Sequence, residues 1–426
     1  MKNKVKYRKI LFLLLALNII GIFAFGYNLL NRSIPDVLKV RVGKNETYDF
    51  NVPLEAHVSV SDQSVELNNK SVPKDEISID LNSPFTMKVS GKTSMDVDIK
   101  WMGLTLKKIK VDTIEDVSLM PSGDVVGIYI KTNGIMILGT GKVTGKDGIQ
   151  TEPAKNIVKS GDYIQSMDGQ QVNSTEDITD ILNQSQGDDV ILKVLRDGES
   201  IDLKLKPVAT TENEFKIGIW IRDDTQGIGT LSFVDENNNF GALGHGIADI
   251  DTSLLIDIKD GELYNSKVMS IVKGKNGTPG EMVGTILYNS QNKIGQITKN
   301  TDSGIYGEIN SASLSYDPEK ALPIGLKQDI HEGAATIRCK IGDEIKDYDV
   351  VVESVEMNSA HPNKDIVIRV VDEGLLSQTN GIIQGMSGSP IIQDGKFIGV
   401  VTHVFLNDCK RGYGIFIENM LNAMND

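Results

Sequence analysis

The stretch Gly385-Met386-Ser387-Gly388-Ser389-Pro390, followed directly by Ile391 to Val401, decides the fold and the chemistry expected of this chain. A serine between glycines on a tight turn exposes its hydroxyl. Backbone N–H groups on such a turn can also converge on an oxyanion, and a nucleophilic serine needs both features. Ser387 is therefore the candidate nucleophile.

The residues after Ser387 favour a β-hairpin over a helix. The Gly-x-Ser-x-Gly elbow of lipases requires glycine at position 389 and a helix after the nucleophile. Serine occupies 389, and two apolar runs, Ile391-Ile392 and Phe397 to Val401, flank the turn signal Asp394-Gly395. This order resembles the Gly-Asp-Ser-Gly-Gly-Pro turn of chymotrypsin-like proteases. A structural turn between two strands is the plain alternative.

Four histidines compete for the role of general base. His245 lies in a Gly-His-Gly phrase directly after an apolar run, a placement that exposes the imidazole. Neutral imidazole is the usual base for a serine hydroxyl near pH 7. His331 lacks the second histidine of a zinc-protease motif, and His361 precedes a proline in a polar loop. His403, on the second strand of the predicted hairpin, is the chief competitor of His245.

An acid is needed to orient the base, and four aspartates between the two candidate residues could supply it. Spacing alone does not rank them. They are Asp249, Asp302, Asp365 and Asp372.

Composition excludes several classes of protein. The chain has 426 residues and 40% hydrophobic content, which is typical of a globular protein of two to three domains at roughly 150 residues each. Its formal charge of -14, without a Lys/Arg cluster after residue 10, argues against a nucleic-acid binder.

Two cysteines, Cys339 and Cys409, exclude a disulfide scaffold, and their wide separation matches no compact metal motif. One bridge and two free thiols are both compatible with the sequence. We expect no cofactor and no metal.

The N-terminus predicts a signal anchor over residues 1–30. A basic flank precedes the apolar run Ile10 to Phe25, and continuing to Leu30 gives about 21 residues, enough to cross ~30 Å of hydrocarbon. The positive flank places everything after Asn31 on the far side of the membrane. The flank consists of Lys2, Lys4, Lys6, Arg8 and Lys9.

Residues 31–113 predict a small β domain. Apolar and polar residues alternate, as in Met95 to Lys100, with turn residues between the runs. His57 lies in one of these strands and is most simply a surface residue. This region shows no chemistry.

Residues 114–210 resemble a PDZ domain. A strand opens at Gly127, a Gly-Asp-x-Ile phrase begins at Gly161, and a helix follows Ser174, whose partner Asp177 completes a capping-box pattern. The last strand runs from Val190 to Arg196.

The resemblance implies a groove for an extended peptide between an edge strand and the helix that follows Ser174. A degenerate PDZ domain that serves only as a spacer is the alternative. The strand residues expected to bound the groove are Gly127, Ile128, Tyr129 and Ile130.

Residues 214–426 are rich in glycine and short apolar runs, which is typical of one or two β-barrels. Five motifs together resemble the SpoIVB peptidase family of endospore formers. They are Trp220-Ile221-Arg222-Asp223, Gly227-Ile228-Gly229-Thr230-Leu231, Phe240-Gly241-Ala242-Leu243-Gly244-His245-Gly246, the run Gly381 to Pro390, and the run Val401 to Asp408.

The resemblance implies a mainly β fold with a small N-terminal β domain, a PDZ domain and a chymotrypsin-like double β-barrel peptidase domain. By motif, the catalytic histidine falls on His245, the serine on Ser387 and the acid on Asp372. The acid lies much closer to the serine in sequence than in chymotrypsin. The backbone N–H groups of Gly385 and Ser387 are the expected oxyanion donors.

The family also implies a role in sporulation. Its members process themselves and act between the two forespore membranes. There they cleave a regulator of a membrane-embedded metalloprotease, so that a mother-cell sigma factor becomes active. The expected partners are therefore the chain itself, that regulator and the membrane. The polar segments Asn31 to Ser33 and Thr210 to Glu214 are candidate cleavage sites.

Two other functions remain open. The first is a quality-control protease of the HtrA type, although there the protease precedes the PDZ domain. The second is a membrane-anchored scaffold without catalysis, in which Ser387 only forms a turn.

Overall fold

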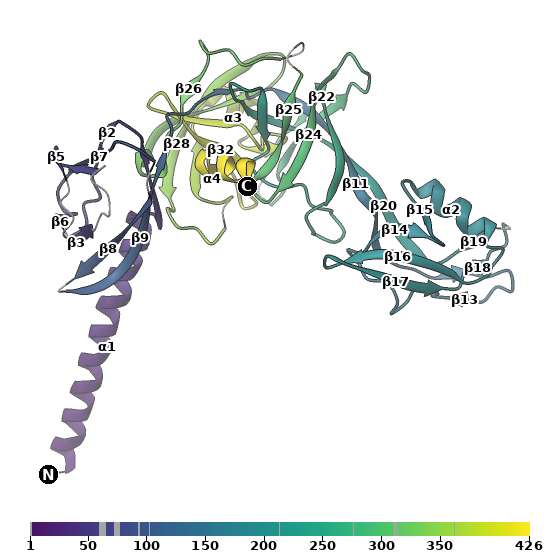
Figure 1. The fold of residues 1–426 in the computed structure, drawn as a ribbon, viewed down its shortest axis with the longest axis horizontal. Helices are drawn as coiled ribbons and strands as arrows, with labels where there is room; N and C mark the ends of the chain where they lie inside the picture. Colours follow the sequence, from purple (N-terminus) through teal and green to yellow (C-terminus); the bar gives the residue numbers. More distant parts are fainter. Residues whose placement is uncertain are drawn as a thin grey trace.

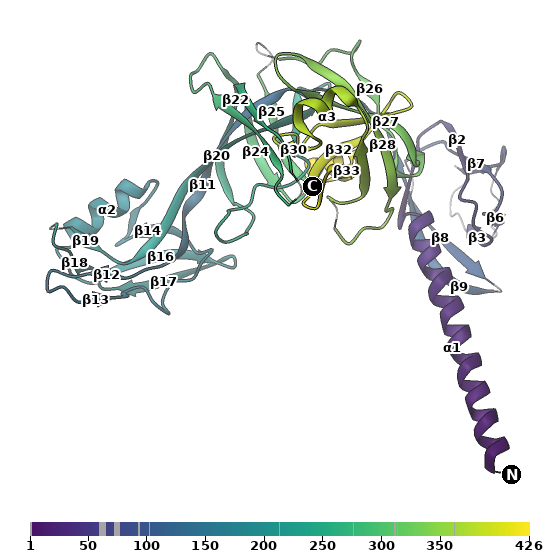
Figure 2. The same cartoon turned by 180° about the vertical axis from the view of Figure 1, so that it is seen from behind.

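The computed structural model describes residues 2–58, 65–71, 77–92, 94–101, 103–212, 214–275, 277–310, 312, 314–361 and 363–426. The fold is mainly β, as the sequence predicts. Figures 1 and 2 show a small β domain beside the long helix α1, a larger central body, and a third unit at the far end.

Helix α1 (Lys2–Ser33) projects away from the other parts (Figure 1). Its segment Lys6–Asn28, with a hydropathy of 2.4, is long and apolar enough to cross a membrane. The segment is compatible with the predicted anchor and with a signal sequence. At the end of the helix, Leu30 and Ile34 are fully buried in the core of the small β domain.

The small β domain consists of two sheets. The five-stranded sheet has the order β1 (Val37–Arg41), β9 (Leu104–Ile114), β8 (Ser94–Trp101), β3 (Glu55–Val58) and β6 (Ile77–Asp80). The four-stranded sheet has the order β2 (Asn45–Tyr48), β7 (Phe85–Val89), β4 (Val65–Leu67) and β5 (Lys70–Ser71).

The junction between α1 and this domain is held by the central body. The side-chain amide of Asn358 donates to the backbone carbonyls of Asn31 (2.6 Å) and Ile34 (2.8 Å). Asn31 to Ser33 were expected to be an exposed site for cleavage, but they belong to α1, and Asn31 and Ser33 are half-buried.

The first barrel of the central body closes through six strands in the order β11-β20-β21-β25-β24-β22 and back to β11. Their bounds are β11 (Val125–Thr140), β20 (Ile219–Val234), β21 (Asn239–Ala242), β22 (Ile258–Val272), β24 (Lys293–Thr301) and β25 (Gly304–Ile309). Strands β10 (Ser118–Pro121), β23 (Gly280–Ile286) and β26 (Leu322–Pro323) flank this barrel.

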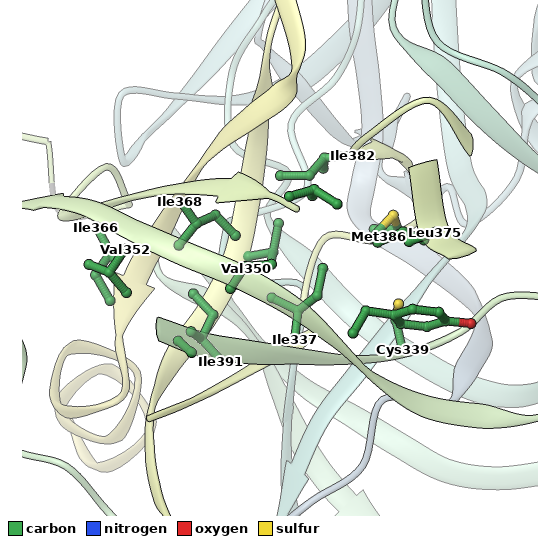
Figure 3. Packing of buried hydrophobic residues seen from close by; sticks show 14 of the residues in the cluster. Ile337, Cys339, Val350, Val352, Ile366, Ile368, Leu375, Ile382, Met386 and Ile391 are labelled. Carbon is green, nitrogen blue, oxygen red and sulfur yellow. The ribbon is translucent and has the colours of Figure 1, made fainter. Parts of the chain in front are cut away.

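The second barrel is closed in the order β27-β28-β29-β33-β32-β31. Many of its buried side chains belong to one apolar cluster, which Figure 3 shows from close by. The bounds are β27 (Gly333–Lys340), β28 (Ile345–Val355), β29 (Ile366–Val370), β31 (Pro390–Gln393), β32 (Lys396–Phe405) and β33 (Asp408–Phe416). The 3-10 turn η1 (Lys327–Asp329), helices α3 (Glu373–Thr379) and α4 (Ile417–Asn425), and the short strand β30 (Ile383–Gln384) complete the body.

The long strands β11 and β20 run side by side from the first barrel into the third unit (Figure 1). The rest of the third unit is formed by the chain that connects these two strands. Residues 135–223 make up this unit, hereafter the PDZ unit. Its helix α2 (Thr175–Gln184) begins with the predicted capping box of Ser174 and Asp177. Its other strands are β12 (Val143–Thr144), β13 (Gln150–Thr151), β14 (Tyr163–Met167), β15 (Gln170–Gln171), β16 (Val190–Arg196), β17 (Glu199–Leu205), β18 (Val208–Ala209) and β19 (Phe215–Lys216).

This insertion corrects the predicted domain bounds. Residues 114–210 were expected to form one domain and 214–426 another, but β10 and the first half of β11 belong to the central body. The PDZ unit therefore interrupts the first barrel instead of preceding it.

Candidate active site

A cleft of about 490 Å³ lies where the two barrels meet. Its walls carry no charged carboxylate, lysine or arginine side chain among the residues that line it. Barrel one and its flanking strands contribute Ile128, Thr225 to Ile228, Leu243, His245 to Ala248 and Pro279. The second half of the body contributes Ile382 to Gly385, Ser387, Thr402 to Val404 and Leu406.

Ser387 lies on the turn between β30 and β31, and glycine is required on both sides of it. Gly385 and Gly388 have φ angles of +99° and +98°, which residues with a side chain rarely adopt. A Cβ on Gly388 would also lie 2.2 Å from the Thr230 carbonyl oxygen. The Gly-x-Ser-Gly pattern therefore reflects a backbone conformation that only glycine tolerates.

The turn is attached to both barrels. Thr230 of β20 donates its hydroxyl to the Gly385 carbonyl (2.7 Å) and its N–H to the Ser387 carbonyl (3.1 Å). The N–H of Gly388 donates to the Val401 carbonyl of β32 (2.7 Å). Met386 is fully buried in the core of barrel two, in the same apolar cluster as Leu375 (Figure 3). These contacts fix the position of the candidate nucleophile, and the Ser387 hydroxyl itself donates to the Thr402 carbonyl (2.7 Å).

His245 follows β21 and enters the same cleft from barrel one. Its Nδ1 lies 2.8 Å from the Gly246 carbonyl oxygen. Because a carbonyl only accepts, this contact places the proton on Nδ1 and leaves Nε2 free to take one. Burial lowers the pKa of His245, against the opposing effect of the Gly246 hydrogen bond. The imidazole is therefore neutral at neutral pH, as a general base requires.

His403 is the other histidine in the cleft. Its ring centroid lies 5.1 Å from that of His245, with 38° between the ring planes. Burial, together with the smaller effects of the nearby His245 and Lys364, lowers the pKa of His403 to about 4. The predicted competitor thus lies beside His245 as a neutral neighbour.

Asp372 does not orient His245 in this structure. It is the N-cap of α3, and its carboxylate accepts from the backbone N–H groups of Leu375 (2.8 Å) and Asp349 (3.5 Å). It does not line the cleft, and the orienting acceptor on His245 is the Gly246 carbonyl. Asp372 therefore does not form the third member of a triad with Ser387 and His245, because its capping hydrogen bonds hold it at the start of α3.

The remaining aspartates also lie elsewhere. Asp249 is buried and forms an ion pair with Arg222. Asp365 accepts from the N–H of Phe416 (3.3 Å) and the amide of Asn419 (2.7 Å), and burial raises its pKa to about 7. Asp302 is exposed. Within the described residues, no group of three or more His, Cys, Asp or Glu side chains could hold a metal.

Several residues named by the sequence have ordinary structural roles. His331 pairs with Asp394 on the surface (2.8 Å). Cys339 and Cys409 are both buried and free, so no bridge joins them. Sequence reasoning missed the carbonyls of Gly246 and Thr402, because a backbone acceptor leaves no trace in residue type. It named Thr230 within a motif but gave no role to the hydroxyl that donates to Gly385.

The predicted peptide groove at Gly127 to Ile130 is wrong. These residues pair with β20 on one side and with β22 on the other, so they present no free edge. Within the described chain, the beginning of β20, Ile219 to Arg222, pairs only with β11, and α2 packs near it and β19. An added peptide strand would find its free edge there.

Comparison with known proteins gives two family matches. Residues 213–421 match the family model described as SpoIVB peptidase S55, and residues 140–206 match the model of the PDZ domain. A search of curated proteins finds no match.

Several solved structures are similar in part. The PDZ domain of the SdrC-like protein from Listeria monocytogenes is 21% identical, over 21% of this chain and 87% of its own, with a TM-score of 0.17. The HtrA-type protease AlgW with a tripeptide is 13% identical over 47% of this chain and 55% of its own, with a TM-score of 0.29. The active form of the Rv3671c protease from M. tuberculosis is 11% identical over 47% and 74%, with a TM-score of 0.27.

Proposed function

We propose, from the premise that this chain is a serine peptidase carrying a SpoIVB peptidase domain and a PDZ domain, that Ser387 is its nucleophile and His245 its general base. One observation carries the assignment: the two side chains line the same cleft although they come from different barrels. The lowered pKa of His245 and its free Nε2 give it the protonation state that a base needs.

The reaction begins when an extended peptide enters the cleft. The Ser387 hydroxyl turns from the Thr402 carbonyl toward Nε2 of His245, passes its proton there, and attacks the scissile carbonyl carbon. The Gly246 carbonyl holds the Nδ1 proton and stabilises the imidazolium. His245 then protonates the leaving amine, and water repeats the sequence to release the acyl group. The N–H groups of Gly385 and Ser387 are our candidates for the oxyanion donors.

The chain would also process itself, with one molecule cutting another. The hairpin Thr210 to Glu214 is one candidate site, since Thr211 and Glu212 are exposed; Asn213 lies outside the described residues. The free edge of β20 in the PDZ unit offers a place to hold the second chain as an added strand.

Self-processing is tested by mixing Ser387→Ala protein with active enzyme. We expect the variant to stay intact alone and to be shortened when active enzyme is added. Shortening of the variant alone would mean that a different protease does the trimming. An intact variant after incubation with active enzyme would exclude processing between molecules.

The physiological role that fits this family is signalling during sporulation. The enzyme, held by α1 or released, would act between the two forespore membranes and cut a membrane-associated regulator of an intramembrane metalloprotease. The apolar segment Lys6–Asn28 supports a membrane location, and the peptidase and PDZ matches support a peptidase that acts on protein substrates.

In a spore former that lacks its own SpoIVB-type peptidase, the wild-type chain should restore processing of the mother-cell sigma factor. Ser387→Ala should not restore it. Equal sigma-factor processing by both chains on an immunoblot would remove the signalling role while leaving peptidase activity untouched.

A further inference from the structure

The segment that follows His245 is bonded both to the first barrel and to the PDZ unit. We call residues 246–257 the His245 loop. On the barrel side, the Asn300 side chain accepts from the N–H of Ile247 (2.9 Å) and donates to the carbonyls of Ile247 and Ile256 (both 2.9 Å). This clamp begins only two residues beyond His245, so the loop fixes the backbone that carries the candidate base.

On the other side, the PDZ unit holds the loop through an ion pair. Arg222 of β20 bonds the carboxylate of Asp249 through Nη1 and that of Asp251 through Nη2 (2.9 Å). The Asp249 side chain is fully buried, and the Arg222 side chain is 28% exposed. A buried carboxylate that loses its cation is strongly destabilised, so this pair fixes the loop firmly only while both partners stay in place.

Asp249 also organises the loop itself. Its second carboxylate oxygen accepts from the N–H groups of Asp251 (3.0 Å) and Thr252 (2.8 Å). Its own N–H donates to the Leu254 carbonyl (2.9 Å). Leu255 in turn packs against Gly246, where an added Cβ would meet its side chain at 2.3 Å. A shift of Asp249 is therefore transmitted to the residue next to His245.

The residue beside Arg222 connects the same strand to α2. Asp223 accepts from the backbone N–H (3.0 Å) and the hydroxyl (3.2 Å) of Thr175, the first residue of α2. Successive side chains on a strand point to opposite faces. Asp223 thus faces the PDZ helix, whereas Arg222 faces the His245 loop. The strand that joins them is the free edge on which a peptide would add.

We propose that Arg222 and Asp249 form a positioning pair through which the PDZ unit sets the orientation of His245. A peptide added to Ile219 to Arg222 shifts or stiffens this strand, and the ion pair passes the change to the His245 loop. The inference rests on the proposed function, since it assumes that His245 acts on Ser387. It makes the PDZ unit a regulator of catalysis as well as a holder of substrate.

The first test measures how fast a peptidyl phosphonate labels Ser387, with kcat and KM for a peptide substrate measured in parallel. Arg222→Ala should slow labelling by ~10- to 100-fold and lower kcat more than KM changes, because a small misplacement of a catalytic group has effects of that size. Asp249→Asn, which keeps one acceptor oxygen for the loop N–H groups but loses the charge and the second acceptor oxygen that faces Arg222, should give an intermediate rate.

The matched control is Arg196→Ala in the same unit. Arg196 forms a comparable pair with the buried Asp162 (2.7 Å), but within the described residues its hydrogen bonds go to Asp162 and Ile157 and none goes to the His245 loop. Its labelling rate should stay within about two-fold of wild type at equal occupancy of the folded state. If Arg222→Ala does not fold, Arg222→Lys, which keeps the charge but loses the planar two-nitrogen fork that holds Asp249 and Asp251, replaces it.

The second test uses reciprocity, because coupling between two sites must act in both directions. Trp220 lies two residues before Arg222 on the same strand and is 68% exposed. With Trp101 replaced by phenylalanine, Trp220 is the only tryptophan. Labelling Ser387 should change its emission in this background, and the change should vanish when Arg222→Ala is added.

Wild-type labelling kinetics in Arg222→Ala, or unchanged Trp220 emission on labelling of the parent, would overturn the coupling. Failure of the wild type to be labelled at all would overturn the proposed function, and the coupling with it. The two failures are thus distinguishable.

Discussion

Peptide cleavage should disappear when Ser387 is replaced by alanine. The change removes the attacking oxygen, and loss of the nucleophile lowers kcat by roughly 10⁶-fold in serine proteases. The fold should survive, because the Ser387 hydroxyl makes a single hydrogen bond, to the Thr402 carbonyl, worth about 1 kcal/mol net. Cleavage of a fluorogenic peptide and a thermal melt measure the two effects separately.

Ser389→Ala is the matched control for this prediction. Ser389 lies on the same turn, is fully buried and does not line the cleft. Its replacement should change cleavage by no more than a few-fold. Wild-type turnover by Ser387→Ala, or equal losses in both variants, would contradict the assignment of Ser387.

The second large effect is expected for His245→Ala, which should lower kcat/KM by ~10³-fold or more, because the Ser387 proton loses its acceptor. His331→Ala is the control, since His331 lies on the surface and pairs with Asp394. The control should retain wild-type activity. Full activity in His245→Ala would transfer the base to another group, His403 first.

The pH dependence follows from the lowered pKa of His245. The base must be neutral to act. As the pH is lowered, kcat/KM should therefore stay constant through pH 6.5, the ordinary pKa of histidine, and should fall only once the pH reaches the lower pKa of His245. The same shift affects stability in the opposite sense to a salt-bridged histidine. The unfolded chain binds more protons below pH 6.5, so the stability contribution falls as pH drops through that region. An acid limb above pH 6.5 would contradict a buried, neutral His245.

The sequence predicted the parts of the site that depend on residue type and local backbone. The glycines around Ser387 are required by the positive φ angles at positions 385 and 388, so the sequence motif directly predicts the turn. His245 was found for a similar reason, because Gly244 and Gly246 pack where an added Cβ would clash. The mainly β fold and the capping box of α2 also follow from local patterns.

The pairing of strands that lie far apart in the chain could not be predicted from the sequence. The sequence of Gly127 to Ile130 is compatible with a strand in the PDZ unit and with a strand in the first barrel. Its pairing with both β20 and β22 assigns it to the first barrel. The insertion of the PDZ unit into that barrel could not be predicted for the same reason, because β11 and β20 each contribute one half to the barrel and the other half to the PDZ unit.

Asp372 illustrates a different ambiguity. An aspartate at the end of a strand can orient a histidine or cap the helix that follows, and both uses need the same acceptor oxygens. In this structure the cap of α3 takes them. The sequence likewise could not indicate that the Gly246 carbonyl holds Nδ1 of His245.

The measurement that bears most directly on the account is covalent labelling by a peptidyl phosphonate, mapped by mass spectrometry of the digested protein. We predict one added phosphonyl group, located on Ser387, in the wild type, with much slower labelling in His245→Ala and none in Ser387→Ala. Labelling that persists in Ser387→Ala, or a wild-type chain that hydrolyses peptides while Ser387 stays unmodified, would contradict the central claim that the His245 and Ser387 cleft is the active site.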